Sequence, residues 1–384
     1  MMSQTINYDV VVIGSGPAGA TTARIAAERG LHVLLVDKRQ ELGAPIQCSG
    51  AVSANALSAA AVIPNDEFVS TPIYGFTVYD THGNATIVDY RKYRDEALGY
   101  VVDRRRFDRY LMTMAERSGV EVWLKTIGEG YQVMGDGRVE VYLSRFGRPL
   151  TVRTRLIVGA DGLQSQVGKW AGLRTHIKLS ELASCLQFVI DQVETDGLLE
   201  IVTGSEWAPG GYAWLFPKGH GYAEVGLGVI RTKTEHDARW HLEHFMKDSF
   251  MAERLQNARI LEVQGGGVPL AAPLKKQVAD HVILVGDAAR HVNPITGGGI
   301  HTALRGGVIA GEFLADFLPL EEYPSAQRLQ AYHERWLSQL GHTMWKLYEV
   351  KTNIFRQRSL AKQDQMLYET LSSYFHPNSK YRKV

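Results

Sequence analysis

Three aromatic side chains stand on alternate positions in the middle of the chain, within the stretch GGYAWLFPKGHGYAEVGLG at 210–228. Tyr212, Trp214 and Phe216 fall on one face of an expected strand, because successive side chains in a strand point to opposite faces. Such a stripe most often packs into the core of a sheet, but it also offers a flat apolar wall to a ligand. Other parts of the sequence decide between these two interpretations.

A glycine-rich turn lies near the start of the chain, between an apolar strand and a helix. Its glycines follow the pattern GxGxxG, and Asp37 ends the next strand. In this context the glycines allow a tight turn, close approach of the backbone to a pyrophosphate and close helix packing, while Asp37 accepts from a ribose hydroxyl. The predicted dinucleotide contacts are Gly14, Gly16, Ala18, Gly19, Asp37 and Lys38.

Two further turns from strand to helix identify the cofactor. The stretch 156–172 carries Asp161, and the stretch 281–307 carries Asp287 followed by three consecutive glycines at a helix start. Asp287 can hold a ribitol hydroxyl, and the amides of the helix start can face a flavin, where they favour negative charge on the reduced ring. A cofactor with ribose, pyrophosphate, ribitol and such a ring is FAD. The predicted amides are those of Gly298, Gly299 and Ile300.

The composition excludes several classes of function. The 42 Lys and Arg residues nearly balance the 41 Asp and Glu residues, so no strong positive field recruits nucleic acid. The two cysteines, Cys48 and Cys185, cannot supply an iron–sulfur cluster, and we predict no metal site. The sequence shows no signal peptide and no apolar run long enough to span a bilayer. We therefore expect a cytoplasmic protein that meets the inner face of the cell membrane only from its surface.

Short alternating segments over 71–88 and 182–268 predict antiparallel sheet, a helix is expected at 104–118, and a strand pair within 120–152. The nucleotide-binding unit is thus interrupted by a sheet domain. The predicted division is an FAD-binding domain over 1–70, 98–180 and 270–320, a sheet domain for the substrate over 71–97 and 181–269, and a helical segment over 321–384.

The stretch 325–374 shows apolar residues spaced three and four apart, which predicts helices. We expect these helices to pack onto the core. The alternative is an amphipathic surface that rests on lipid. In that case the headgroups would meet the basic side chains of Lys346, Lys351, Arg356, Arg358 and Lys362.

The three turn motifs, in this order, resemble those of flavoproteins with the p-hydroxybenzoate hydroxylase architecture. The resemblance implies an α/β fold in which a Rossmann-type FAD-binding domain is interleaved with an antiparallel-sheet substrate domain, with a C-terminal helical segment. It also implies that Arg104 touches the flavin or its pyrophosphate, and that the backbone near Gly128 lies beside the adenine.

The stretch 209–217 reads PxxYxWxFP, which is similar to the signature of the geranylgeranyl reductase family, and more closely to the archaeal digeranylgeranylglycerophospholipid reductases. The stretches APIQCSGAVS and NPITGGGI agree with this. The resemblance implies saturation of isoprenoid chains in lipid precursors by flavin hydride transfer and protonation. One departure is Ser49, where relatives commonly carry glycine after the cysteine. We expect Cys48 and Ser49 to lie beside the flavin.

An isoprenoid chain can be held only by apolar area, which Tyr212, Trp214 and Phe216 would supply over the flavin. Cys48 is a candidate proton donor or positioning group, although a free cysteine is equally often a small buried apolar residue. Tyr212 is a second candidate acid. His291 and His301 flank the predicted flavin loop and are expected to be structural.

Other functions on the same scaffold stay open. A flavin monooxygenase or halogenase would insert oxygen or consume it, and a menaquinone side-chain reductase would use another isoprenoid substrate. An electron carrier feeding quinones is disfavoured by the missing cluster cysteines, and a protein that merely retains FAD would show no turnover. The electron donor is either reduced ferredoxin or NAD(P)H, because no second GxGxxG provides a separate nicotinamide domain.

Overall fold

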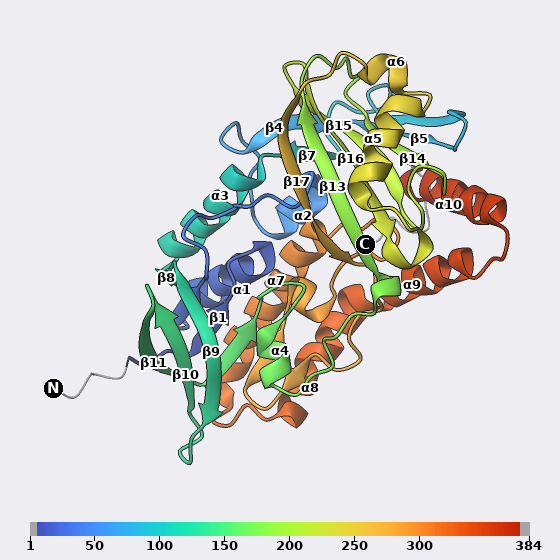
Figure 1. Cartoon of the computed structure of the whole chain (residues 1–384). Helices are drawn as coiled ribbons and strands as arrows, with labels where there is room; N and C mark the ends of the chain where they lie inside the picture. Colours follow the sequence, from blue (N-terminus) through green and yellow to red (C-terminus); the bar gives the residue numbers. More distant parts are fainter. Residues whose placement is uncertain (1–5, 377–384) are drawn as a thin grey trace.

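A six-stranded sheet forms the centre of the nucleotide-binding part of the protein (Figure 1). The structure, a computed structural model, describes residues 6–376. The strand order is β18-β19-β12-β1-β2-β8, parallel except for the edge pair β18 and β19. The strands are β1 (Val10–Ile13), β2 (Val33–Val36), β8 (Glu121–Trp123), β12 (Leu156–Gly159), β18 (Val278–Ala279) and β19 (Val282–Leu284).

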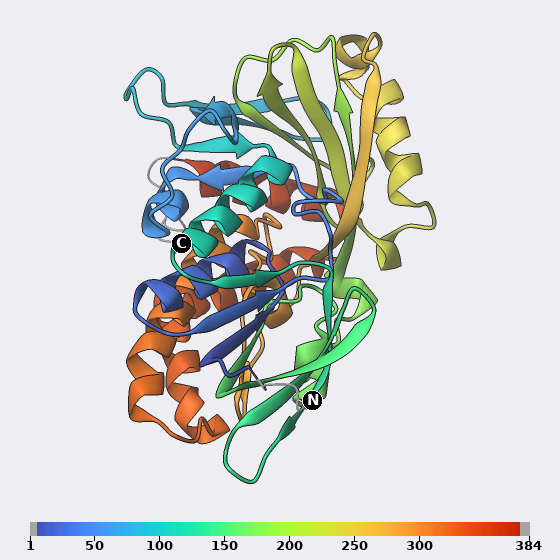
Figure 2. The same ribbon diagram turned by 90° about the vertical axis from the view of Figure 1, so that its left-hand side faces the viewer.

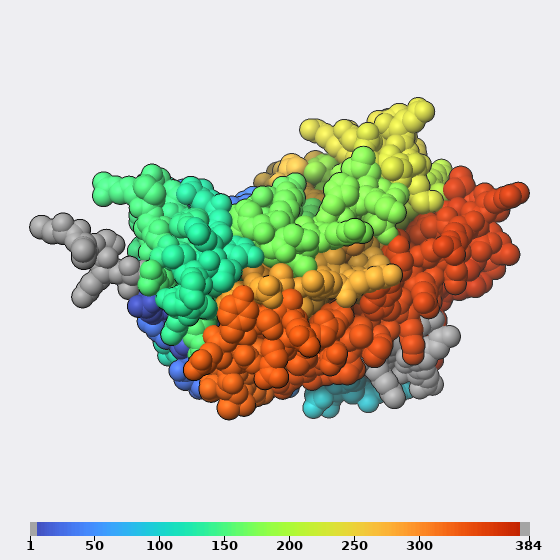
Figure 3. All heavy atoms as spheres, turned by 90° about the horizontal axis from the view of Figure 1, so that it is seen from below, coloured from blue at the N-terminus to red at the C-terminus, as the bar shows by residue number. Residues whose placement is uncertain are grey.

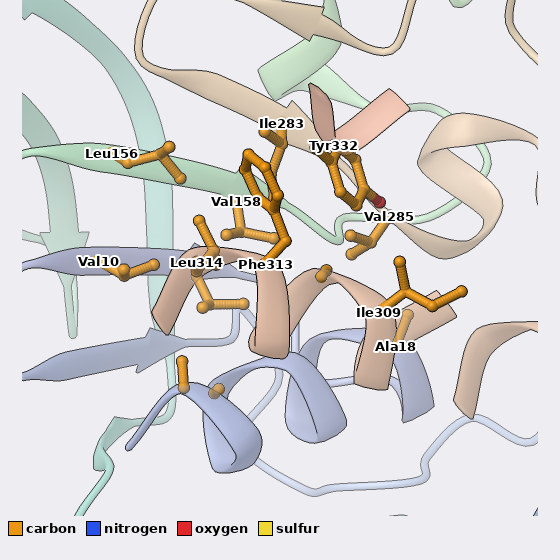
Figure 4. Packing of buried hydrophobic residues seen from close by; sticks show 14 of the residues in the cluster. Val10, Ala18, Leu156, Val158, Ile283, Val285, Ile309, Phe313, Leu314 and Tyr332 are labelled. Carbon is orange, nitrogen blue, oxygen red and sulfur yellow. The ribbon is translucent and has the colours of Figure 1, made fainter. Parts of the chain in front are cut away.

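Both faces of this sheet are covered, which explains why β1, β2 and β12 are apolar without alternation. On one face, Val10 and Val158 pack against Phe313 and Leu314 of the long helix α7 (Figure 4). The helices beside the sheet are α1 (Pro17–Glu28), α3 (Arg104–Arg117), α7 (Ile300–Phe317) and α8 (Ala326–Trp336).

The other face is covered by a small antiparallel sheet of order β11-β10-β9. The sequence predicted a strand pair within 120–152, whereas the structure has three strands there and a fourth, β8, in the parallel sheet. The prediction therefore missed two strands, because the turns between these strands are short. The three strands are β9 (Thr126–Val133), β10 (Val139–Arg145) and β11 (Arg148–Thr154).

A seven-stranded sheet of order β17-β13-β16-β15-β14-β5-β6 forms the second part. Its neighbours are antiparallel, as predicted, except β14 and β5, which run parallel. The strands are β5 (Gly75–Tyr79), β6 (Ala85–Asp89), β13 (Leu182–Ile190), β14 (Leu199–Thr203), β15 (Tyr212–Gly219), β16 (Tyr222–Ile230) and β17 (Ile260–Pro269).

A third sheet has three strands in the order β3-β7-β4. In the chain, its strands lie between strands of the two larger sheets. Its strands are β3 (Ala51–Ser53), β4 (Val69–Ile73) and β7 (Gly99–Val102), and the short helices are α2 (Ala54–Ala59), α4 (Gln166–Trp170) and α6 (Ala252–Leu255). The interruption of the nucleotide-binding unit by sheet segments is therefore seen in the strand order. The exact domain boundaries given above stay a prediction.

The seven-stranded sheet has helices on both faces (Figure 2). Helix α5 (Ala238–Asp248) packs on the outer face through Leu242 and Phe245, against Ala213 and Leu215 of β15. The C-terminal helices α9 (His342–Phe355) and α10 (Leu360–Phe375) lie over the inner face. The aromatic strand is thus placed between a packed core and these last two helices.

The C-terminal segment is helical, as predicted, and its apolar side chains pack into the protein. Trp336, Leu340 and Met344 are buried around a π-turn at Leu337–Gly341, which connects α8 to α9. Figure 3 shows this segment, coloured orange to red, along one face of the molecule. Among the basic residues considered for a lipid surface, Lys351 is buried and therefore does not belong to that surface. Within residues 6–376, no helix is long and apolar enough to cross a membrane.

The close contact of α1 and α7 depends on glycine at position 311. A Cβ atom there would lie 2.6 Å from Cβ of Ile25 and 2.9 Å from the carbonyl oxygen of Thr22. We predict that Gly311→Ala destabilises the protein by about 1–3 kcal/mol through this overlap, although alanine is the better helix former. Urea unfolding measures the change.

Ala331→Gly, at an exposed position of α8, provides the matched control. This substitution changes only the helix propensity, and it should lower the free energy of unfolding by about 1 kcal/mol. A gain of stability in Gly311→Ala would contradict the close packing of the two helices.

Candidate active site

One cavity of about 1000 Å³ connects the glycine-rich turns with the inner face of the seven-stranded sheet and with α9 and α10. Its two ends differ in chemistry. The polar end is lined by Gly14, Ser15, Gly16, Asp37, Lys38, Arg104, Asp161, Asp287, Gly298 and Gly299. The apolar end is lined by Ile73, Phe76, Leu199, Ile201, Trp214, Phe216, Ile354 and Leu367. The cavity therefore suits two ligands bound side by side, a polar one at the first end and an apolar one at the second.

The first glycine-rich turn fits a pyrophosphate. Gly14 has φ +107°, and a Cβ there would lie 2.2 Å from the carbonyl oxygen of Ala160, so only glycine is accommodated. A Cβ on Gly16, in contrast, would meet no atom within 4 Å, because its backbone borders the open cavity. Gly16 is the N-cap of α1 and has no side chain to bond the first amides of the helix. These amides are free to bind an anion at the positive end of the helix dipole.

Asp37 connects β2 to this turn. Its carboxylate, only 6% exposed, accepts hydrogen bonds from the amide of Ser15 at 2.9 Å and from the amide of Arg39 at 2.8 Å. Oδ2 also accepts from the Ser15 hydroxyl, whereas Oδ1 keeps a lone pair that can accept from a ribose hydroxyl. Ala18 and Gly19 follow in α1, and Lys38 is exposed at the rim of the cavity. The ribose contact of Asp37 stays a prediction.

The second glycine-rich turn leads into α7 and borders the same cavity, and the amide of Gly298 in it donates to Oγ1 of Thr296 at 3.2 Å. Gly299 is the N-cap of α7 and makes no side-chain capping bond, so the amides that follow it lack a side-chain acceptor. Asn293 holds the preceding loop, since its Oδ1 accepts from the amides of Ile295 at 3.0 Å and Thr296 at 3.1 Å. Gly298, Gly299 and Ile300 all line the cavity, and their contact with a flavin stays a prediction.

Asp287 lies at this helix start, where a Cβ on Gly299 would be 3.5 Å from its Oδ1. Burial raises the pKa of Asp287 to about 6, and the positive charge of Arg104 partly offsets this effect. Arg104 is fixed by Asp108, whose two carboxylate oxygens accept from its Nε and Nη2 at 3.1 Å. Burial lowers the pKa of Arg104, but Asp108 and Cys48 more than compensate and leave it raised. A guanidinium group that is ion-paired with Asp108 therefore lines the cavity and acts electrostatically on Asp287.

Asp161 and Gly128 also line the cavity, but the structure gives each of them a local role as well. The Asp161 carboxylate accepts from the Ser165 hydroxyl at 2.6 Å and from the amide of Val167 at 3.0 Å, so it stabilises the start of α4. At Gly128 a Cβ would lie 3.1 Å from Cδ1 of Ile13. The sequence motif around Asp161 did not distinguish this capping role from a cofactor contact.

The aromatic strand β15 faces the apolar end of the cavity. Tyr212, Trp214 and Phe216 line it, while the residues between them pack toward α5. Gly226 on β16 lies opposite Trp214, and a Cβ there would be 2.6 Å from Cζ2 of the indole. The expected period of two is therefore confirmed, and the stripe forms a wall of the cavity rather than an enclosed core.

Tyr212 connects this wall to the second glycine-rich turn, because its hydroxyl donates a hydrogen bond to the carbonyl oxygen of Thr296. Burial raises the pKa of Tyr212, and the nearby thiols of Cys185 and Cys48 raise it further. The phenol is therefore protonated at neutral pH. Cys48 is half-buried, lines the cavity and accepts from the amide of Gly50 at 3.5 Å. Ser49 lies beside it on the cavity wall.

The two histidines near the second turn differ in position. His291 is fully buried outside the cavity, where it stacks on Trp336 and bonds Gln277 at 2.8 Å, and burial lowers its pKa to about 3. His301 lines the cavity, and burial lowers its pKa to about 4. Both rings are neutral at physiological pH.

Sequence reasoning missed several residues that border this cavity. Cys185 and Gln187 are two residues apart on β13, and both line the cavity. The period of two predicts that they share one face of the strand, but it does not predict that this face borders the cavity. Burial raises the pKa of the Cys185 thiol to about 12. Lys351 and Tyr374 come from α9 and α10, and the helical pattern placed neither of them at a cofactor or substrate site.

The sequence and the fold of this chain match those of known proteins. Residues 181–268 match the family described as the geranylgeranyl reductase catalytic domain, and 9–121 and 66–209 match two FAD binding domain families. A digeranylgeranylglycerophospholipid reductase of Methanothrix thermoacetophila is 39% identical over 350 residues, which cover 91% of this chain and 88% of the relative. One from Methanosarcina acetivorans is 37% identical over 336 residues, 87% of this chain and 82% of the relative.

Among solved structures, a geranylgeranyl bacteriochlorophyll reductase-like protein from Thermoplasma acidophilum superimposes with a TM-score of 0.88 at 28% identity. The match covers 99% of this chain and 95% of that one. A p-nitrophenol 4-monooxygenase from Pseudomonas putida has a TM-score of 0.72 over 99% of this chain and 97% of that one. At 18% identity it shows the shared fold alone.

The fold, the two glycine-rich turns and the FAD binding domains together define an FAD-dependent oxidoreductase. Among such enzymes, the chain belongs to the geranylgeranyl reductase family, with relatives named digeranylgeranylglycerophospholipid reductases. The roles of the individual residues stay predictions.

Gly16→Asp should abolish FAD retention without loss of the fold. Asp and Asn are both favourable N-cap residues, and the position has open space, so the apoprotein should fold in either variant. The carboxylate of Gly16→Asp, however, would repel the pyrophosphate. The ratio of flavin absorbance to protein after gel filtration should fall to near zero for Gly16→Asp and remain measurable for Gly16→Asn. An unchanged ratio in Gly16→Asp would remove the assigned role of this turn.

Asp287 predicts a pH dependence of stability in flavin-free protein. Its native pKa of about 6 lies above the ordinary value of 3.8, so the native state binds the proton more tightly than the unfolded state. Its contribution to stability is complete below about pH 3.8 and is lost as the pH rises through 6. Asp287→Asn should therefore gain stability relative to the wild type between pH 5 and pH 7.5, as measured by urea unfolding. A difference that does not change with pH contradicts the buried position of this carboxyl group.

Proposed function

We propose that this protein saturates the C=C bonds of geranylgeranyl chains in membrane-lipid precursors. The main support is that the aromatic wall and the second glycine-rich turn border one continuous cavity and are joined by the bond from Tyr212 to Thr296. The names of the relatives support the same substrate class. FAD bound in its reduced form supplies the hydride in this chemistry.

An isoprenoid chain offers almost no hydrogen-bonding groups, so its binding free energy must come from apolar area, at about 25 cal/mol per Å² removed from water. In our proposal Trp214 and Phe216 bind one side of the chain, and Ile354 and Leu367 from α9 and α10 enclose the other. The alkene has no carbonyl group to polarise it. Orientation of the double bond and exclusion of water therefore supply much of the rate enhancement.

The second hydrogen must reach the alkene as a proton. We assign this role to the hydroxyl of Tyr212 or the thiol of Cys48, which both line the cavity. Tyr212 is protonated at neutral pH, and its hydroxyl would have to turn from the carbonyl oxygen of Thr296 toward the alkene to give up this proton. Arg104 beside Cys48 would stabilise a thiolate after proton transfer from that group.

The proposal includes where the protein works and how it is reduced. We place it in the cytoplasm, in contact with the inner face of the cell membrane, because its substrate is a membrane lipid. Electrons would come from reduced ferredoxin or from transiently docked NAD(P)H, since the sequence contains no second nucleotide fingerprint. A menaquinone side chain is an alternative substrate with the same chemistry, and an oxygen-inserting reaction is the main alternative activity on this scaffold.

Anaerobic incubation of chemically reduced enzyme with geranylgeranyl lipids, followed by mass spectrometry, distinguishes these activities. We expect the lipid to gain one H₂ for each double bond, whereas insertion of oxygen would contradict the proposal. Trp214→Ala should lower this turnover at least tenfold, because it removes apolar wall, and should leave the flavin content close to that of the wild type.

Trp240→Ala is the matched control, since Trp240 is an exposed tryptophan on α5, beyond the outer face of the same sheet. It should change neither turnover nor flavin content. Equal loss of flavin and turnover in Trp214→Ala would make the aromatic strand merely structural.

A further inference from the structure

Lys351 places a buried cation on the wall of the cavity. The residue lies on α9, is 7% exposed and lines the cavity, with its Nζ donating to the carbonyl oxygen of Leu270. Within residues 6–376, no carboxylate forms a salt bridge with it. The nearest acidic influence is Glu181, whose carboxylate already accepts from the Tyr348 hydroxyl at 2.6 Å. Its Nζ also lies 5.6 Å from the ring centre of Tyr348, so the ammonium group meets a carbonyl oxygen and an aromatic face but no carboxylate in direct contact among these residues.

A buried ammonium group without a counterion is costly, and proteins seldom retain one without a reason. Burial lowers the pKa of Lys351 to about 8, and Lys233 adds to this shift while Glu181 opposes it. The side chain is thus still mostly protonated at neutral pH. One carbonyl oxygen satisfies only one of its three N–H donors. The remaining donors and the positive charge suit an anionic ligand in the cavity.

A second cation lies nearby, at the surface. Lys233 is exposed, and its Nζ is 5.0 Å from the ring centre of Phe355 and 3.4 Å from Oε1 of Gln363. Phe355 is one turn after Lys351 on α9 and also lines the cavity. Gly210, another residue of the wall, packs against the aliphatic part of Lys233. The two lysines thus flank the same end of the cavity, one inside and one at the surface.

We propose that Lys351, assisted by Lys233, binds the phosphate of the lipid substrate's headgroup. This inference rests on the proposed function and specifies how its substrate is oriented. The cavity wall continues from Phe355 and Ile354 to Trp214, so a phosphate at Lys351 leaves the attached chain along the apolar wall. Leu270, whose carbonyl bonds Lys351, lies beside Gly297 of the second glycine-rich turn. The headgroup end of the chain would therefore be the part nearest to that turn.

Equilibrium binding to the flavin-loaded protein tests this inference without turnover. The probes are geranylgeranyl monophosphate and geranylgeraniol. Binding of each probe is measured by the change in the protein's tryptophan fluorescence. We expect the wild type to bind the monophosphate about 10- to 100-fold more tightly, as for hydrogen bonds to a charged group. Lys351→Met should remove this preference while its affinity for geranylgeraniol stays unchanged, and Lys351→Arg should retain most of it. Lys346→Met, an exposed lysine on the same helix, should bind both probes like the wild type.

Inorganic phosphate separates a lipid headgroup from free phosphate. It should compete with the monophosphate only weakly, because the chain contributes most of the affinity, whereas competition as strong as that of the monophosphate would overturn the assignment. Stability provides a second measurement. Lys351→Met should raise the midpoint of thermal unfolding, because it removes an uncompensated buried charge, and a marked loss of stability would identify Lys351 as a structural residue instead.

Equal affinity of the wild type for the two probes would overturn the headgroup inference, as would a preference that persists in Lys351→Met. Such a result would not affect the proposed function, which the mass measurement on geranylgeranyl lipids tests independently. If the lipids gain hydrogen but the phosphate makes no difference to binding, only the orientation proposed here is wrong.

Discussion

The proposed chemistry depends on contact between two segments with different roles, and Ile295 of the second turn packs in one apolar cluster with Phe216 of the aromatic strand. The hydroxyl of Tyr212, on the aromatic strand, donates to the carbonyl of Thr296, in the turn that provides the amides at the start of α7. The nucleotide-binding part of the protein consists of buried parallel strands and short turns, whereas the apolar wall belongs to a separate sheet. Without a fixed contact between them, a cofactor and an isoprenoid chain could each bind and still not meet.

The cavity also explains why the two sets of residues differ so strongly in chemistry. At the polar end, glycines border the cavity with their backbone, and Arg104 forms an ion pair with Asp108. At the apolar end, Gly226 provides room for the indole of Trp214, and α9 and α10 close the wall. The cation of Lys351 interrupts this apolar end, and it is the feature that an uncharged ligand leaves unexplained.

Much of the polar end could be predicted from the sequence, because each turn there is a local motif. The glycines at 14, 16 and 19 and the pair of Asp287 with Gly299 lie within a few residues of a strand and a helix, and their geometry follows from those neighbours. The period of two along β15 likewise predicted one face for Tyr212, Trp214 and Phe216, and the structure confirms it.

The other walls of the cavity come from tertiary contacts that no local pattern specifies. Lys351 was treated as a candidate for a lipid surface because a lysine on an amphipathic helix is usually exposed, yet it is buried against the carbonyl of Leu270. The parallel pairing of β14 with β5 joins strands more than a hundred residues apart, so hairpin rules did not apply. Asp161 was ambiguous for another reason, since a carboxylate before a helix can bind a ligand or the helix amides.

A crystal structure of the FAD-loaded protein with a geranylgeranyl lipid bound is the most direct test of the central claim. The account predicts that the chain lies against Trp214 and that one of its double bonds is in van der Waals contact with the flavin ring. A chain bound outside the cavity, or a protein wall between the chain and the ring, would contradict it.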